Sequence, residues 1–255
     1  MNENIVTTDI KQIKFEKFNK AFTIINVVIA GLFTLLFLVL FILVESGLVR
    51  LVISGIWLIS NVIWLFRGAE KKHFLRSTLS CIFIPVTIMM MSVMIAGVHS
   101  DSPWRYNLQL DYVKYYKSHA FKVAPEKLPD DISDYGFHFV ATLGQGAGHS
   151  SVRFEASQDV IKAYEEEYSA KAIYTYPYSE FEHGYSIYVD EISPKASATW
   201  EDDKSLYIYS DTDFWAESTS ATVYVTSATH NWNHPHSTAV IIDSEKNMIE
   251  FAQLG

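Results

Sequence analysis

Residues 21–44 have the sequence AFTIINVVIAGLFTLLFLVLFILV, which contains no charged side chain. Two more apolar stretches follow within the first hundred residues: 47–66 (GLVRLVISGIWLISNVIWLF), in which Arg50 carries the one charge, and 77–98 (STLSCIFIPVTIMMMSVMIAGV). A helix rises about 1.5 Å per residue and the hydrocarbon core of a bilayer is about 30 Å thick, so about 20 apolar residues can span it. The sequence therefore predicts a membrane protein with three transmembrane α-helices, over 21–44, 47–66 and 77–98.

The basic residues that flank these stretches predict the orientation of the chain. The loop between the first two spans, residues 45–50, has one basic residue, Arg50, at the start of the second stretch. Two other segments are rich in basic residues: Lys11, Lys14, Lys17 and Lys20 before the first stretch, and Arg67, Lys71, Lys72 and Arg76 before the third. Basic flanks are retained in the cytoplasm, so we expect residues 1–20 there. Three spans then place 99–255 outside, as the extracytoplasmic domain of a multi-pass cell-membrane protein. Trp64, Trp104 and Tyr106 are expected in the aromatic belts at the interfaces.

The charge of the chain changes sign along its length. Residues 1–100 carry nine Lys and Arg against five Asp and Glu, whereas residues 101–255 carry eleven against twenty-four. An acidic domain of this kind does not attract nucleic acid, which excludes that class of partner. The single cysteine, Cys81, lies in the third apolar stretch, so the outer domain has no disulfide. With no N-x-S/T glycosylation acceptor either, the composition favours a bacterial cell envelope.

Hydrophobic periodicity predicts an α+β fold for the outer domain. Apolar residues alternate with polar ones over 137–143 and 150–155, and further short strands are predicted over 172–176, 185–189, 205–210, 221–226, 238–242 and 248–252. Ser157 is expected to cap a helix over 158–170, with Ile161, Tyr164 and Tyr168 on its buried side. The turn residues DSEKN (243–247) predict a hairpin between the last two strands. We expect a mainly antiparallel sheet of about seven strands with one or two helices packed on it.

The strongest candidate for a chemical site is the sequence His230-Asn-Trp-Asn-His234-Pro-His236. If His234 and His236 begin the strand that leads into 238–242, the two-residue period of a strand points both rings to one face. His230, from the preceding loop, then supplies a third nitrogen, which is a ligand set that zinc or copper favours. The alternative is an ordinary loop, because Asn, His and Pro are all common in turns.

Other motifs indicate structure and no chemistry. Gly144-Gln-Gly-Ala-Gly-His149 lies between two predicted strands, which favours a hairpin turn over a phosphate-binding loop. Gly148-His-Ser150-Ser-Val152 lacks the second glycine of a nucleophile elbow, and a Ser/His/Asp triad assembled from distant residues stays open. The three apolar stretches contain no Asp, Glu, Lys or His, which argues against a transporter or pump. No catalytic and no cofactor-binding residue is predicted.

The resulting hypothesis is a membrane-anchored, extracytoplasmic binding or sensing module. Its support is the aromatic content of the outer domain, since aromatic residues are enriched at interaction surfaces: Tyr174, Tyr176, Tyr178, Trp200, Tyr207, Tyr209, Trp215 and Trp232. The expected partners are the lipid bilayer and either an envelope protein, a cell-wall component or a second copy of the chain. The alternative hypothesis is a metal-dependent exported enzyme, in which His230, His234 and His236 hold a transition-metal ion such as zinc.

Overall fold

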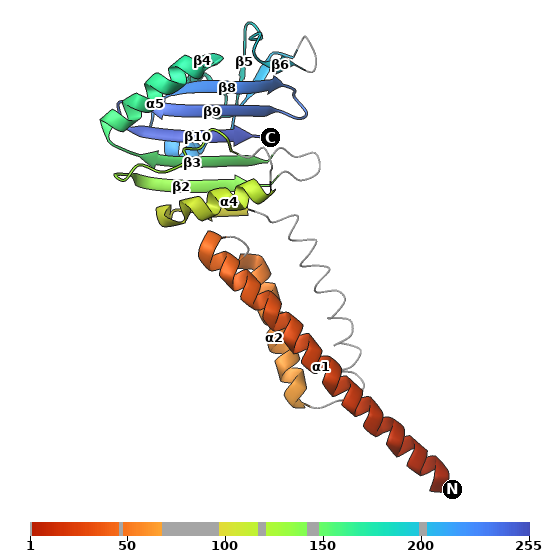
Figure 1. The fold of residues 1–255 in the computed structure, drawn as a ribbon. Coiled ribbons are helices and arrows are strands. Elements are labelled where there is room, and N and C mark those ends of the chain that lie inside the picture. The colour runs from red at the N-terminus through yellow and green to blue at the C-terminus, as the bar shows by residue number, and fades with distance from the viewer. Residues whose placement is uncertain (1, 46–47, 68–96, 117–120, 142–147, 199–202) are drawn as a thin grey trace. The chain divides into compact units, whose positions relative to one another are not determined.

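The computed structural model describes residues 2–45, 48–67, 97–116, 121–141, 148–198 and 203–255 of the chain (Figure 1). These residues belong to two compact units, Met1–Ile95 and Ala96–Gly255. Most of the third predicted transmembrane helix, residues 77–96, lies outside the described residues. Its last two residues, Gly97 and Val98, lie in strand β1 (Gly97–Ser100) and not in a helix. Val98 is 1% exposed opposite Phe139, so this part of the apolar stretch belongs to the core of a sheet.

The first unit contains two long apolar helices, α1 (Asn2–Val44) and α2 (Leu48–Arg67). By length and composition alone, their segments Glu16–Val44 and Leu48–Phe66 could each cross a membrane. The two helices pack together through the buried residues Ala30, Phe37 and Trp57. Arg50 is buried as well, and its guanidinium lies 5.7 Å from the centroid of the Phe37 ring.

The second unit is built on an eight-stranded, mostly antiparallel sheet, which confirms the predicted α+β class. Seven strands follow one another in the order β1-β2-β3-β10-β9-β8-β4, and β6 (Ser197–Ala198) pairs with β8 in parallel. The bounds of the other six are β2 (Ser133–Val140), β3 (His149–Glu155), β4 (Tyr174–Pro177), β8 (Thr222–His230), β9 (His236–Asp243) and β10 (Met248–Leu254). A separate ribbon pairs β5 (Ser186–Tyr188) with β7 (Ser205–Tyr207).

The predicted hairpin between the last two strands is confirmed. Strands β9 and β10 are antiparallel neighbours, and one carboxylate oxygen of Asp243 accepts the backbone N–H groups of Glu245 and Lys246, each at 3.0 Å. Asn247 completes the turn in the left-handed region, with φ 59°. An Asx-type turn of this kind is the reason that DSEKN could be recognised from sequence.

Helices cover one face of the sheet, which we call the helix face. They are α4 (Tyr106–Tyr116), preceded by the 3-10 turn η1 (Pro103–Arg105), and α5 (Gln158–Lys171). Ser157 stands at the N-cap position of α5 as predicted, although its side chain makes no capping bond. Tyr164 and Tyr168 of this helix pack edge-on against Phe251, with ring centroids 5.2 and 5.8 Å away.

Tyr106 also packs on the helix face, which corrects its assignment to an interfacial aromatic belt. Its ring is 3% exposed, lies edge-on to Phe137 at 6.3 Å, and its hydroxyl donates to the carbonyl of Pro125. Aromatic residues are equally suited to a core and to an interface, so the sequence alone did not separate the two. Trp104, by contrast, is 66% exposed.

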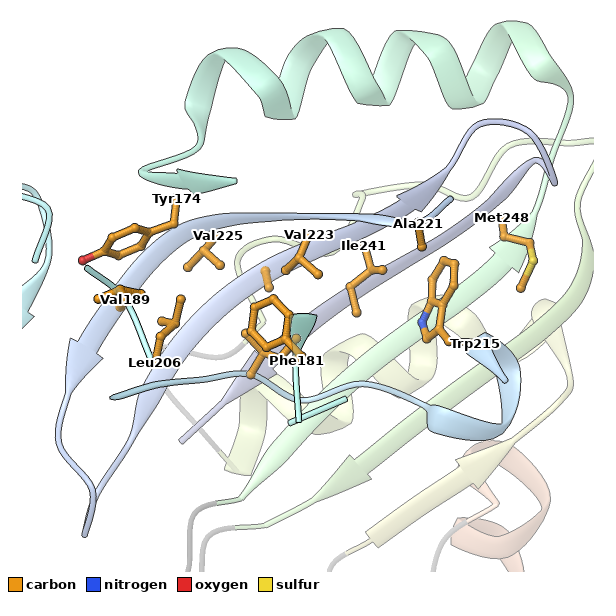
Figure 2. Close-up of a cluster of buried hydrophobic side chains, with 13 residues drawn as sticks. Tyr174, Phe181, Val189, Leu206, Trp215, Ala221, Val223, Val225, Ile241 and Met248 are labelled. Atoms are coloured by element: carbon orange, nitrogen blue, oxygen red, sulfur yellow. The ribbon is translucent and has the colours of Figure 1, made fainter. Parts of the chain in front are cut away.

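The opposite side of the sheet, which we call the far face, is covered by irregular chain. It includes the 3-10 turn η2 (Tyr178–Glu180), the β5–β7 ribbon and a covering segment, residues 208–215, which ends in the short helix α6 (Thr212–Trp215). Figure 2 shows the buried cluster that these covering elements form with the sheet, on the side away from α5. The cluster includes Val223, Val225 and Ile241 from the sheet, Leu206 from β7 and Trp215 from the covering segment.

Candidate functional site

The far face of the sheet is apolar in one half and polar in the other. Directly opposed residues of antiparallel strands point to the same side of a sheet. Glu250 of β10 lies opposite both Ile241 of β9 and Arg153 of β3, so these three share the far face. The face is therefore apolar towards β8 and polar from β10 to β1, where its residues include His99, His138, Ser151, Arg153 and Glu250. These five residues are the starting point of the candidate site.

Glu250 is a carboxyl group without access to solvent. Its exposure is 0%, in a strand whose neighbouring residues Ile249 and Phe251 are also buried. The carboxylate accepts the backbone N–H of Asp211, at 3.1 and 3.0 Å to its two oxygens, and the indole N–H of Trp215 at 2.6 Å. Burial raises the pKa of Glu250 to about 7, and these donors oppose part of that rise. The pKa of this buried carboxyl group therefore lies near neutral pH.

Arg153 fixes the covering segment to the sheet beside Glu250. Its Nε lies 2.8 Å from a carboxylate oxygen of Asp211, and its Nη1 lies 3.0 Å from one of Asp134. The guanidinium also stacks over the ring of Phe214, 4.5 Å from the centroid. On β2, Gly136 stands opposite Arg153 of β3. A Cβ added to Gly136 would lie 2.8 Å from Nε of Arg153. A glycine at that position leaves the space that the arginine side chain occupies.

A cluster of histidines surrounds Tyr209 at the other end of the polar half. The hydroxyl of Tyr209 and Nδ1 of His138 are 2.5 Å apart, and the Tyr209 ring stacks on His149 with centroids 3.9 Å apart. His138 also meets His149 and His99 edge-on, with centroids 4.9 and 5.5 Å away. Burial, and then the neighbouring His99, lower the pKa of His138, while Asp211 acts in the opposite direction. Burial raises the pKa of Tyr209, so its hydroxyl keeps its proton at neutral pH.

A groove of about 640 Å³ adjoins Arg153 at the opposite end of the polar half. Phe214 and Met248 supply apolar surface to it. Its charged lining contains four carboxylates and two cations: Asp134, Glu155, Asp213, Glu217, Arg153 and Lys246. The volume lies in the range of about 300–1,000 Å³ that is typical of small-molecule sites.

The three histidines predicted as metal ligands occupy different environments. His230 is the last residue of β8, not of a loop, and it is fully buried. Its Nε2 lies 2.9 Å from the hydroxyl of Tyr174 and its Nδ1 lies 2.9 Å from the carbonyl oxygen of Ser205. Both ring nitrogens are thus engaged with protein groups.

His234 and His236 are exposed, and only His236 lies in strand β9. His234 stands in the preceding turn, where its backbone N–H donates to the side chain of Asn231 at 3.0 Å. Within the described parts of the chain, no group of three or more His, Cys, Asp or Glu residues is placed to hold a metal ion. The metal site remains a prediction from the sequence, to be tested by metal analysis.

The aromatic residues that suggested a binding surface differ in exposure, and four of them are half-buried: Tyr176, Tyr178, Tyr207 and Tyr209. Tyr174 and Trp215 are buried in the cluster of Figure 2. Trp232, at the tip of the β8–β9 connection, is 65% exposed, and Trp200 lies outside the described residues. Aromatic content alone therefore does not locate a surface in this domain.

Sequence reasoning did not identify Arg153, Glu250, His138 and Tyr209 as site residues. One signal was present, because Glu250 is the single charged residue in the mostly apolar strand MIEFAQL (248–254). A lone carboxylate in a strand that is buried on both faces requires a specific partner. Its partners, Asp211 and Trp215, lie 39 and 35 residues away in the chain, in a region that shows no periodic pattern.

No family model, no curated protein and no solved structure matches this chain.

Proposed function

We propose that the second unit is a binding module that takes a cationic ligand in the groove beside Arg153. The observation that carries this proposal is the unequal charge of the groove, with four carboxylates against two cations around an apolar surface. The ligand class that fits is an amine or guanidinium on a short hydrocarbon chain. Phe214 and Met248 would contact the chain, and the carboxylates would hold the charged end.

The pairing of the charged residues strengthens this electrostatic argument. Arg153 is neutralised by Asp134 and Asp211, and the ammonium of Lys246 donates to the backbone carbonyl of Glu217. The carboxylates of Asp213 and Glu217 have no ion-pair partner among the residues that the structure describes. A carboxylate and an ammonium 4 Å apart attract by about 4 kcal/mol at an effective dielectric constant near 20, before desolvation is subtracted.

The location proposed for the module is the outer side of a cell membrane. The two long apolar helices are candidates for an anchor, and basic residues flank them on the side expected to be cytoplasmic. The third apolar stretch, 77–98, ends inside β1, whose first two residues are Gly97 and Val98. Partners in that location would be a cell-wall component or an envelope protein that exposes amino groups.

Binding of a cationic peptide to the full chain in detergent tests this proposal. The probe is a fluorescent tri-lysine amide, with a tri-glutamate peptide of the same length as its control, followed by fluorescence anisotropy. We expect saturable binding of tri-lysine only. The double variant Asp213→Asn/Glu217→Gln should weaken it about tenfold, which corresponds to about 1.4 kcal/mol.

The matched control is Glu166→Gln/Glu191→Gln, which removes the same charge from exposed positions that do not line the groove. It should bind as the wild type does. Equal weakening by both double variants would show that net charge, and not the groove, attracts the peptide. No saturable binding of tri-lysine by the wild type would also reject the proposal.

A further inference from the structure

We propose that the covering segment, residues 208–215, is a pH-sensitive latch, which stays closed over Glu250 while this carboxyl group is protonated and opens more often once the group is ionised. The latch is a property of the fold, and its test needs no ligand. Its consequence for the groove rests on the proposed function, whereas the latch itself does not.

The covering segment supplies hydrogen-bond donors to the carboxyl group that it covers. Glu250 has 0% exposure, and it accepts the backbone N–H of Asp211 at 3.1 and 3.0 Å and the indole N–H of Trp215 at 2.6 Å. Within the sheet, its neighbours in register are Arg153 of β3 and Ile241 of β9. Movement of the segment away from the sheet would therefore break both donor contacts and let water reach the carboxyl group.

The segment is attached to the rest of the unit less firmly than a strand of the sheet is. The N–H of Ile208 donates to the carbonyl of Tyr185 at 2.8 Å, and the carboxylate of Asp211 pairs with Arg153 at 2.8 Å. Residues 208–211 form neither helix nor strand, and α6, which follows them, is four residues long. Segments with few backbone hydrogen bonds to their neighbours open locally at a lower free energy than core strands do.

Burial of the carboxylate makes this opening sensitive to pH. The donors Asp211 and Trp215 favour the ionised form, but desolvation is the larger effect and raises the pKa of Glu250 from 4.5 to about 7. In the open segment, water solvates the carboxyl group, restores its ordinary pKa and takes up its proton. The state with the lower pKa gains population as pH rises, so the equilibrium constant for opening should increase about 30-fold between pH 5.5 and 8.5.

The other titratable side chains near Glu250 come from β3, from η2 and from the segment itself: Arg153, Tyr178, Tyr209 and Asp211. Burial raises the pKa of both tyrosines from the ordinary value of 10.0, so they keep their protons over this range. Two histidines contact Tyr209: His138, whose Nδ1 lies 2.5 Å from its hydroxyl, and His149, which stacks on its ring. A variant of His138 is therefore one of the controls.

The latch carries part of the groove wall. Asp213 and Phe214 belong to the covering segment and line the groove, and the guanidinium of Arg153 lies over the Phe214 ring at 4.5 Å. Opening of the segment separates these two side chains from lining residues that the sheet supplies, such as Met248. The groove is therefore complete only while the latch is closed.

Hydrogen–deuterium exchange of the full chain in detergent, followed by mass spectrometry, measures the opening. At each pH, the exchange rate of the peptide that contains residues 208–215 is divided into the rate of the same peptide when unfolded, which gives a protection factor. We expect this factor to be lower than that of β10 at every pH, and to fall about 30-fold from pH 5.5 to 8.5. Equal protection of the segment and β10 would show that only global unfolding exposes Glu250, and would reject the latch.

Variants identify the group that controls the latch. Glu250→Gln, which keeps the size of the side chain and removes its charge, should make the protection of 208–215 independent of pH. The controls are Glu166→Gln, at an exposed position of α5, and His138→Gln, and both should keep the change of about 30-fold. Protection that is independent of pH in the wild type, or a pH dependence that persists in Glu250→Gln, would overturn the proposal.

A second variant tests the latch if Glu250→Gln does not fold. Trp215→Phe removes a donor that favours the ionised form, so it should raise the pKa of Glu250 further. The change in protection between pH 5.5 and 8.5 should then exceed 30-fold, by about the factor that the rise in pKa supplies. A change equal to that of the wild type would contradict the latch.

Discussion

Trp215 donates its indole N–H to the carboxylate of Glu250 across 2.6 Å, inside a core where both side chains are at most 1% exposed. The bond joins the short helix α6 to β10, a strand in the middle of the sheet. The indole N–H supplies one of the hydrogen bonds that the buried carboxylate of Glu250 accepts. The Trp215 ring also packs against apolar side chains of the far face. One residue thus contributes both to the core and to the polar site.

Replacing Trp215 by Phe should destabilise the second unit by about 2 kcal/mol or more. The change leaves the buried carboxylate of Glu250 with one donor fewer, and hydrogen bonds to charged groups contribute about 1.5–3 kcal/mol. Chemical denaturation followed by circular dichroism measures this loss in the free energy of unfolding. Trp232→Phe, at a position 65% exposed, is the control and should cost less than about 0.5 kcal/mol. Equal losses in the two variants would contradict this account of Trp215.

The stability of the second unit should fall as pH rises from about 4.5 to 7, because of Glu250. Its pKa is raised in the folded state from 4.5 to about 7, so the folded state binds more protons than the unfolded state in that window. The stabilisation is fully present below the unfolded pKa and is lost above the folded one, for a total of about 3 kcal/mol. Glu250→Gln should flatten the pH dependence, whereas Glu166→Gln, on the exposed side of α5, should not. If stability still fell with pH in Glu250→Gln, the pH dependence would come from other titratable groups.

A fragment that begins at Ala96 should fold alone and be more stable than one that begins at Asp101. The shorter fragment lacks β1 and with it the buried side chain of Val98, which is worth about 1.5–3 kcal/mol. It also leaves β2 as an unpaired edge. Thermal melting and size-exclusion chromatography compare the two. If both melt at the same temperature, β1 does not contribute to the stability of the unit.

His230→Ala should destabilise the fold by about 2–3 kcal/mol, because it leaves a cavity and removes the imidazole that contacts both the Tyr174 hydroxyl and the carbonyl oxygen of Ser205. His234→Ala, at an exposed position, should have little effect. We expect both results with and without EDTA, and elemental analysis of the purified chain should be run in parallel. About one bound transition-metal ion per chain, lost on His234→Ala, would instead support the metal-dependent enzyme.

Fusion of reporter proteins after Gly255 should place the second unit outside the cytoplasm. The expectation rests on the basic residues that flank the apolar stretches. Alkaline phosphatase, which is active only after export, should be active in this position, and a reporter that works only in the cytoplasm should not. The opposite pattern would reverse the orientation and would exclude a partner in the cell wall.

The elements that could be predicted from the sequence are those whose pattern is local. The strands predicted over 150–155 and 248–252 and the helical stripe of Ile161, Tyr164 and Tyr168 correspond to β3, β10 and α5 within a few residues. The β9–β10 hairpin was recognisable because its turn residues are adjacent in the chain. Strand β1 was missed because Gly97 and Val98 extend an apolar stretch, and pairing with β2, about forty residues later, was not visible.

The sequence by itself determined the apolar N-terminal helices, the α+β class, the acidic charge of the second unit and most of its strands, since these depend on composition and on periods of two or 3.6 residues. Only the tertiary structure decided the site. Sheet register places Glu250 beside Arg153, and the covering segment brings Asp211 and Trp215 onto them from more than thirty residues away. The reason is physical: a buried charge is stabilised by partners that are close in space, and closeness in space between distant residues arises only when the strands pair.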